Sequence, residues 1–361
     1  MKIGLYSPFL ADNIGGGEHY LLTVAECLLP QHQVDLIVPR QTLGLSDKFR
    51  RSFNLKLSGL NFVVGPFNSQ SSGLDRAKFT RRYDVFYYMT DGSFFIPQAK
   101  FNAVHFMVPF NQPPNLWQRL KLKAWPVKTA NSFFTKKHLE KKWRIQINYV
   151  HYPAAIDSSF LGTSPKKNII LTAGRFFSSS GNKHCKRQDF LVKTFKILCD
   201  QGLTGWQLIL SGPIDKGKDN LNYAKKVAQL AKGYPITIRH EGSFKQLQQD
   251  YCQAKIYWHA AGYGQDQENN PEAVEHFGIT TVEAMSAGAV PVVINQGGQP
   301  EIVTNGINGL LWNDQADLIK KTSAIIQDHK LFHKLQLQAQ LRAKDFSKDK
   351  FCQETYKIFN L

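Results

Sequence analysis

Short apolar runs alternate along the chain with longer stretches of helical periodicity. Strands that are apolar on both faces are typical of parallel sheets covered by helices. In the first half the predicted strands are Lys2–Tyr6, Val34–Val38, Val85–Met89, Ala103–Met107, Val127–Ala130 and Ile147–His151. In the second half they are Asn168–Ala173, Gln207–Ser211, Thr237–His240, Ile256–His259, Val290–Ile294 and Gly309–Trp312. The pattern predicts an α/β protein with two doubly wound domains.

A polar segment bounded by prolines separates the two sets of strands. It runs from Tyr152-Pro153 to Pro165, and a length of 361 residues also favours two domains over one. From Asp314 onward the pattern is helical to the end, with a break at Asp345-Phe346-Ser347. We therefore expect domains over residues 1–155 and 156–340, followed by a C-terminal helix over 341–361.

Hydropathy and cysteine usage indicate a cytoplasmic protein. No apolar run approaches the roughly 18 residues of a membrane-spanning helix, and the first residues are interpreted as a buried strand. The five cysteines are scattered, odd in number and without C-x-x-C spacing, which predicts neither a disulfide framework nor a zinc site. They are Cys27, Cys185, Cys199, Cys252 and Cys352.

Positive charge is concentrated in the first half of the chain. The formal net charge is +17, and residues 1–160 hold 20 Lys and Arg against 10 Asp and Glu. From Arg119 to Arg144 nine basic residues and one acid, Glu140, are interleaved with aromatic side chains. This segment fits an anionic membrane surface or an anionic acceptor, and a solvated basic surface is an equal alternative. Nucleic acid is the least favoured partner and no nucleic-acid partner is expected, because no recognisable binding module accompanies the charge; a nucleic-acid binder that uses this segment is a further alternative.

Two carboxylates flank the expected start of a helix. Glu275 and Glu283 have seven residues between them, and the helix should begin near Phe277 or Gly278. Its unpaired N–H groups would face an anion, and the two carboxylates would lie very roughly 12 Å apart, which suits hydroxyl groups at the two ends of a sugar nucleotide. A solvated helix face is the alternative interpretation.

Glycine turns and basic side chains follow several predicted strands, where doubly wound folds bind ligands. The glycine turns are Gly15-Gly16-Gly17 and Gly297-Gly298, which let the backbone approach a phosphate closely. A simple αβ turn is the alternative for the second of them. Arg175, Lys183 and Lys186 are fixed cations that follow the first predicted strand of the second half and are available to balance the charge of a diphosphate.

The Glu275-x7-Glu283 element, followed by Ala284-Met285-Ser286-Ala287-Gly288 and the Gly297-Gly298 turn, resembles the donor site of retaining GT-B glycosyltransferases. The specific resemblance is to glycosyltransferase family 4, the glycosyl transferases group 1. It implies two Rossmann-like domains facing across a cleft, with the acceptor on the first and the nucleotide sugar on the second. The last helix would cross back onto the first domain.

The resemblance also implies roles for individual residues. Gly16 and Gly17 would close over the donor phosphates, Arg175 and Lys186 would hold the diphosphate, and His105 would face the transferred sugar. Lys183 competes with Lys186 for this role, and a satisfied core histidine is the alternative for His105. Gly242 and Ser243 are expected where the nucleotide base stacks. The other expected donor residues are Glu275, Phe277, Gly278, Ile279, Thr280, Glu283, Gly297 and Gly298, and Asp91 is the candidate on the acceptor side.

The chain departs from the family pattern at one place. The family has a small pair such as Pro-Ser where this sequence has His259-Ala260-Ala261-Gly262, and a polar loop continues to Val274. The segment from His259 to Gly262 is expected to line the donor pocket. Asp266-Gln267-Glu268 is the nearest approximation to the Asp-x-Asp pair of metal-dependent glycosyltransferases, and we expect no metal and no cofactor there.

The expected function is metal-independent transfer of a hexose, with retention, from a UDP, GDP or ADP sugar to a glycan, lipid or lipid-linked acceptor, as in polysaccharide biosynthesis. The protein would be cytoplasmic and peripheral on the membrane. The alternatives are a non-catalytic GT-B protein that binds sugar nucleotides, and a related phosphorylase or epimerase.

Overall fold

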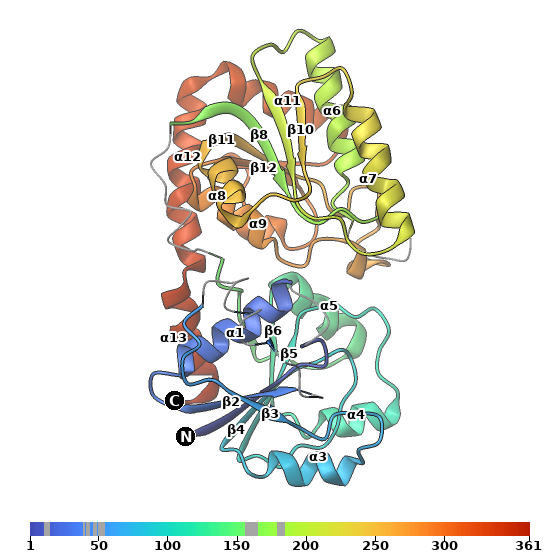
Figure 1. The fold of residues 1–361 in the computed structure, drawn as a ribbon, viewed down its shortest axis with the longest axis vertical. Helices are drawn as coiled ribbons and strands as arrows, with labels where there is room; N and C mark the ends of the chain where they lie inside the picture. The colour runs from blue at the N-terminus through green and yellow to red at the C-terminus, as the bar shows by residue number, and fades with distance from the viewer. Residues whose placement is uncertain are drawn as a thin grey trace. The chain divides into compact units, whose positions relative to one another are not determined.

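The chain forms two compact units (Figure 1). The computed structural model describes residues 1–10, 15–38, 40, 44–45, 49, 55–155, 165–178 and 185–361. Unit 1 comprises Met1–Ala154 with Lys348–Leu361, and unit 2 comprises Ala155–Ser347.

Unit 1 is built on a parallel sheet with the strand order β3-β2-β1-β4-β5-β6-β7. The strands are β1 (Lys2–Tyr6), β2 (Gln33–Val38), β3 (Asn61–Val64), β4 (Val85–Met89), β5 (Phe101–Phe106), β6 (Val127–Ala130) and β7 (Tyr149–Val150). The helices are α1 (Gly16–Leu28), α3 (Gly73–Thr80), α4 (Leu116–Leu122), α5 (Phe133–Trp143) and α13 (Lys348–Phe359). The strand order reverses between β1 and β4, which is the topological switch point of a doubly wound sheet.

Alternation along the strands of unit 1 sends side chains into two cores. On β4, Val85, Tyr87 and Met89 pack with α1 and α13. Phe86 and Tyr88 of the same strand pack with α3, α4 and α5. Both faces of the sheet are therefore buried, which explains why its central strands are continuous apolar runs.

Unit 2 is built on a parallel sheet with the strand order β10-β9-β8-β11-β12-β13. The strands are β8 (Lys167–Ala173), β9 (Gln207–Ser211), β10 (Ile236–Arg239), β11 (Ala254–His259), β12 (Val290–Ile294) and β13 (Leu310–Trp312). The α-helices are α6 (Gln188–Asp200), α7 (Lys218–Ala231), α8 (Phe244–Gln253), α9 (Ile279–Ser286), α10 (Gln299–Ile302), α11 (Gln315–Gln327) and α12 (His329–Ala343). Two short 3₁₀ helices are η2 (Pro271–Ala273) and η3 (Lys344–Phe346). The prediction of two doubly wound parallel sheets is confirmed.

One strand was not predicted from the sequence. All twelve expected strands are present, and β3 is the additional one at the edge of the first sheet. Phe62 and Val64 are 36% and 53% exposed, so β3 lacks the buried apolar run that marks the central strands. A half-exposed edge strand gives a weaker pattern.

The prediction that no cysteines pair is wrong. Cys27 on α1 and Cys352 on α13 form a disulfide across a sequence separation of 325 residues. The Tyr356 hydroxyl also donates a hydrogen bond to the carbonyl of Cys27 at 3.1 Å, so α13 is fixed against α1. The spacing of the cysteines along the sequence does not predict this pair, because only packing of the last helix onto the first brings the two thiols together.

None of the helices in the described part of the chain is long and apolar enough to cross a membrane.

Candidate functional site

Helix α9 begins where the sequence predicted. Gly278 is its N-cap, with Glu275 before the helix and Glu283 within it. Gly278 has a φ of 118°, and a Cβ there would lie 2.2 Å from Nε2 of Gln299, so only glycine fits this turn. The first amides of α9 have no partners within the helix and point out of its N-terminus.

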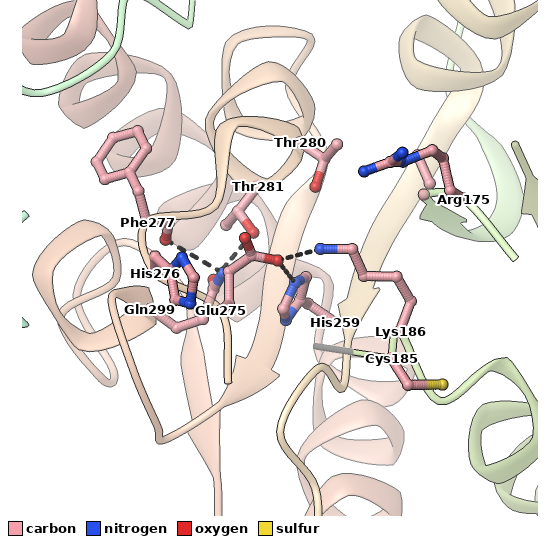
Figure 2. Close-up of polar contacts among 12 residues, drawn as sticks. Arg175, Cys185, Lys186, His259, Glu275, His276, Phe277, Thr280, Thr281 and Gln299 are labelled. Atoms are coloured by element: carbon pink, nitrogen blue, oxygen red, sulfur yellow. Dashed lines mark hydrogen bonds and ion pairs between the residues drawn. The ribbon is translucent and has the colours of Figure 1, made fainter. Parts of the chain in front are cut away.

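A three-residue carboxylate cluster, Lys186, Glu275 and His259, lies beside the start of α9 (Figure 2). One carboxylate oxygen of Glu275, Oε2, forms an ion pair with Nζ of Lys186 and lies 2.9 Å from Nε2 of His259. The side chains of Lys186 and Glu275 are 14% and 13% exposed, and that of His259 is 2% exposed. Burial lowers the pKa of His259, and the hydrogen bond to Glu275 acts in the opposite direction. The imidazole is therefore neutral at pH 7, whereas the two charged partners compensate each other.

Lys186 reaches Glu275 by lying across the end of β8. A Cβ on Gly174 would come within 2.9 Å of Cγ of Lys186, so the glycine makes room for the lysine stem. Arg175 follows directly, is 43% exposed, and has Nη1 3.9 Å from Oδ1 of Asp215. Lys183, the competing lysine, lies outside the described residues. In the structure Lys186 contacts the carboxylate, and Arg175 is partly accessible to solvent.

The Gly297-Gly298 turn is fitted against the backbone of the Glu275 segment. The amide of Gly298 donates to the carbonyl of Glu275 at 2.8 Å, and the amide of Gly297 donates to Oε1 of Gln267 at 2.9 Å. A Cβ on Gly297 would lie 2.1 Å from the carbonyl oxygen of Glu275. These glycines allow close packing of two backbone segments, and their contact with a diphosphate stays a prediction.

Two tyrosines that sequence reasoning did not identify support the same region. The Tyr251 hydroxyl donates to Oε2 of Glu283 at 2.8 Å, and the Tyr257 hydroxyl donates to Oγ1 of Thr280 at 2.7 Å. Burial, followed by the charge of Glu283, raises the pKa of Tyr251 well above its ordinary value. The available signal was strand alternation, because Tyr257 and His259 occupy positions i and i+2 of β11 and share a face.

The residues expected near the nucleotide base border an open hollow of about 630 Å³. Gly242 and Ser243 line it together with Arg239 and His240, at the end of β10. Ser243 caps α8 by accepting a hydrogen bond from the amide of Gln246 at 3.2 Å. Contact with a base stays a prediction.

His105 belongs to a buried histidine network in unit 1, formed by Tyr20, His105 and His151. The Tyr20 hydroxyl lies 3.2 Å from Nδ1 of His105 and 2.5 Å from Nδ1 of His151. Nδ1 of His105 also lies 2.7 Å from Oγ1 of Thr129, and its Nε2 lies 3.1 Å from Sδ of Met107. Burial, followed by the neighbouring His151, lowers the pKa of His105 well below its ordinary value. His105 is 0% exposed, and its contact with a sugar stays a prediction.

The remaining candidates of unit 1 lie at the carboxyl ends of its strands. Gly16 and Gly17 begin α1, and Gly17 lies close to Met89 of β4, since a Cβ there would be 3.4 Å from Cε of Met89. Asp91 follows β4 and accepts hydrogen bonds from the Tyr88 hydroxyl at 3.1 Å and from the amide of Ser93 at 3.0 Å. The roles predicted for these residues are untested.

Within the described ranges, no group of three or more His, Cys, Asp or Glu side chains could hold a metal ion. Asp266, in the segment closest to an Asp-x-Asp pair, accepts a hydrogen bond from the amide of Glu268 at 2.9 Å and so stabilises its own turn.

Sequence comparison places the carboxylate-cluster residues Lys186, His259 and Glu275 inside a family match. The family described as "Glycosyl transferases group 1" matches residues 156–342. The alpha-1,3/1,6-mannosyltransferase ALG2 of Dictyostelium discoideum is 31% identical over 157 residues, which cover 40% of this chain and 34% of ALG2. The matched segment thus spans about a third of that relative's length.

Similar folds occur among solved structures. A glycosyltransferase from Rickettsia africae ESF-5 has a TM-score of 0.73 and 18% identity, covering 99% of this chain and 97% of its own. Anabaena Alr3699/HepE in complex with UDP has a TM-score of 0.73 and 17% identity, covering 99% of both chains. The same protein in complex with UDP-glucose has a TM-score of 0.70 and 17% identity, covering 99% and 98%. These likenesses confirm the predicted fold class, the two α/β units of GT-B glycosyltransferases.

Proposed function

The chain belongs to the glycosyl transferases group 1, and on this premise we propose that it transfers a hexose from a nucleotide-diphosphate sugar to a glycan or lipid-linked acceptor, with retention at the anomeric carbon. The carboxylate cluster of Lys186, Glu275 and His259 beside the start of α9 carries the proposal, because it joins a carboxylate, which can accept hydroxyl groups, to a fixed cation.

The leaving diphosphate needs positive charge. Arg175, Lys186 and the first amides of α9 supply it in the proposal, without a metal ion. An ammonium has three donors, so its ion pair with Glu275 leaves Lys186 able to bind a phosphate oxygen as well. Figure 2 shows the Arg175 guanidinium on the same side of the site as the Lys186 ammonium.

The two glutamates take different parts of the donor in the proposal. Glu275 accepts hydroxyl groups of the transferred sugar, and Glu283, oriented by Tyr251, accepts those of the ribose. Lys186 and His259 both contact one oxygen of Glu275, which stabilises its negative charge and makes it a weaker nucleophile. This favours front-face substitution, in which the leaving phosphate takes the acceptor proton, over a double displacement through Glu275.

Within this proposal His105 has the weakest support as a residue at the sugar, since its side chain is 0% exposed and both ring nitrogens have partners in unit 1.

A panel of UDP, GDP and ADP sugars, with glucose and mannose forms of each base where they exist, tests the donor. A relative is named a mannosyltransferase and a structural neighbour binds UDP-glucose, so both sugars belong in the panel. A donor at 100 times its dissociation constant should stabilise the protein by about 2.7 kcal/mol, measured as a thermal shift. Hydrolysis or transfer of that donor supports the proposal.

Different outcomes identify the alternatives. Binding without hydrolysis or transfer to any acceptor would indicate a non-catalytic protein. Consumption of free phosphate would indicate a phosphorylase, and conversion of one sugar nucleotide into another would indicate an epimerase. Binding of no sugar nucleotide would contradict the proposed function.

We further propose that helix α4 docks on an anionic membrane surface. Leu116, Trp117 and Leu120 are 70%, 72% and 46% exposed, and their helical spacing places them on one side of α4. Arg119 and Lys121 flank this stripe, and the sequence has no acidic residue between positions 92 and 139. A protruding apolar stripe with basic flanks suits insertion between anionic headgroups.

Flotation with vesicles tests the membrane proposal. The protein should float with vesicles that contain about a third anionic lipid and stay behind with neutral ones. The double variant Trp117→Ser/Leu120→Ser should lose binding. Leu74→Ser on α3, at a side chain that is 73% exposed, is the matched control and should keep it. Equal binding to neutral vesicles, or full binding by the double variant, would contradict the proposal.

A further inference from the structure

His259 stands at the carboxyl end of β11, on the face of the sheet that carries the site. Ile256 and Trp258 of the same strand point into the core formed with α6 and α7. Alternation turns Tyr257 and His259 the other way, toward α9 and the segment before it. The strand therefore places a ring nitrogen of His259 on the Glu275 carboxylate.

The backbone of Glu275 is held independently of this contact. Its carbonyl accepts the Gly298 amide at 2.8 Å, and Gly297 packs directly against the same carbonyl. The backbone is fixed by the glycine turn, so the contacts of Lys186 and His259 act on the carboxylate end of the side chain. Removing His259 should therefore change the orientation of the carboxylate and leave the path of the chain in place.

The chemistry of the pair fixes which group donates. An ammonium on the same oxygen keeps Glu275 ionised, and an ionised carboxylate can only accept hydrogen bonds. Nε2 of His259 must then carry the proton, and Nδ1 must carry a lone pair. Nδ1 is buried and has no hydrogen-bond partner among the described residues. Burying an unpaired nitrogen opposes folding, so the contact of Nε2 with Glu275 is the polar interaction that offsets this cost.

We propose that His259 is a positioning residue, whose Nε2–H holds the carboxylate of Glu275 in the orientation that accepts hydroxyl groups of the transferred sugar. This inference rests on the proposed function. The two partners of the carboxylate act differently. Lys186 carries a positive charge that offsets the charge of Glu275, whereas His259, kept neutral by burial, only fixes the orientation of the carboxylate.

Substitutions at His259 test whether the side chain acts as a hydrogen-bond donor to Glu275 or only fills space. His259→Gln places an amide N–H close to the original Nε2, whereas His259→Asn is too short to reach Glu275 and serves as its matched control. We expect kcat to fall about 10-fold or more in His259→Asn and His259→Ala, with KM for the donor changed less than about 3-fold, and His259→Gln to restore most of the loss. Tyr251→Phe, which removes the donor to Glu283, should instead raise KM.

Nitrogen NMR of histidine-labelled protein tests the contact without any turnover. The wild type should show His259 as the neutral Nε2–H tautomer at pH 7, and Glu275→Gln should shift its Nε2 resonance. Equal loss of kcat in the Gln and Asn variants, or an Nδ1–H tautomer in the wild type, would overturn the inference. If the wild type transferred no sugar at all, the proposed function would fail, and the tautomer would still decide whether His259 donates to Glu275.

Discussion

The histidine network of unit 1 and the carboxylate cluster of unit 2 have similar arrangements of side chains but differ in charge and exposure. Each places a histidine of a central strand against polar side chains from neighbouring elements. The network consists of neutral groups, with Tyr20, His105 and His151 only 1%, 0% and 2% exposed. The cluster contains a cation and an anion, each with more than a tenth of its side chain exposed. A lowered histidine pKa occurs in both regions and therefore does not distinguish a site from a core.

The contacts of the two regions explain the difference. In unit 1, Nε2 of His151 lies 3.2 Å from the carbonyl oxygen of Phe351 on α13, and Tyr20 joins α1 to the same histidine. The network thus fastens the last helix to the first one, next to the disulfide. In unit 2, the cluster contains partly exposed charged groups beside the N-terminus of α9. We infer that the first region serves stability and the second serves binding and turnover.

The largest expected effect comes from removing the cation of the cluster. Lys186→Gln should lower donor turnover by about 10²–10³-fold, because a fixed charge that stabilises the leaving group is lost. The variant also leaves Glu275 without its countercharge, so thermal unfolding is measured in parallel and turnover is compared per folded molecule. The control is Lys193→Gln on the exposed side of α6, which should retain full turnover. If turnover fell only in proportion to the loss of folded protein, the cluster would serve stability as the histidine network does, and the proposed difference between the two regions would be wrong.

Acid should destabilise unit 1 through its histidines. Burial lowers the pKa of His151 from 6.5 to about 4, so the unfolded chain takes up a proton that the folded unit does not. The stabilising contribution is intact above pH 6.5 and is lost as the pH falls toward 4, by up to about 3 kcal/mol.

Hydrogen exchange, read by mass spectrometry on peptides of unit 1 between pH 7 and 4.5 and corrected for the intrinsic rate, measures this loss. A His151→Gln variant should show a smaller dependence on pH. An unchanged dependence in that variant would mean that other groups cause the acid sensitivity.

The smallest expected effect is loss of one hydroxyl group from the network. Tyr20→Phe leaves Nδ1 of the buried His151 without its hydroxyl partner, whereas Nδ1 of His105 keeps Thr129. The loss should cost about 1–3 kcal/mol of unfolding free energy, measured by denaturant titration. Turnover per folded molecule should stay the same. Tyr234→Phe, whose hydroxyl bonds Asp200 at an exposed position, is the control and should cost less. A loss of turnover per folded molecule in Tyr20→Phe would instead assign the histidine network a role in the reaction.

Local pattern was sufficient to predict most of the fold and the start of α9. Buried parallel strands are continuous apolar runs, and the glycine at position 278 follows from a backbone that only glycine adopts. Edge strand β3 was missed because half-exposed residues carry no such run. The disulfide was missed because its cysteines are brought together by packing of the two end helices.

The same division, between local pattern and packing of distant segments, applies to the contacts within the site. The sequence predicted Glu275, Glu283 and Lys186 as donor-site residues, and the structure places Lys186 against Glu275 beside the start of α9. The sequence could not show that Tyr251 contacts Glu283, because a buried tyrosine is usual in any core and its partner is 32 residues away. The fit of the Gly297-Gly298 turn against Glu275 was also hidden, since two backbone segments approach each other there without side chains.

The most direct test of the central claim measures donor affinity and turnover separately in Glu275→Ala and Glu283→Ala. Affinity is read by calorimetry with the nucleotide sugar, and turnover by release of the nucleotide. We predict that Glu283→Ala weakens donor binding, whereas Glu275→Ala lowers kcat by more than it lowers affinity, because each carboxylate serves a different end of the donor. Equal losses of affinity in both variants, with kcat unchanged, would contradict the account.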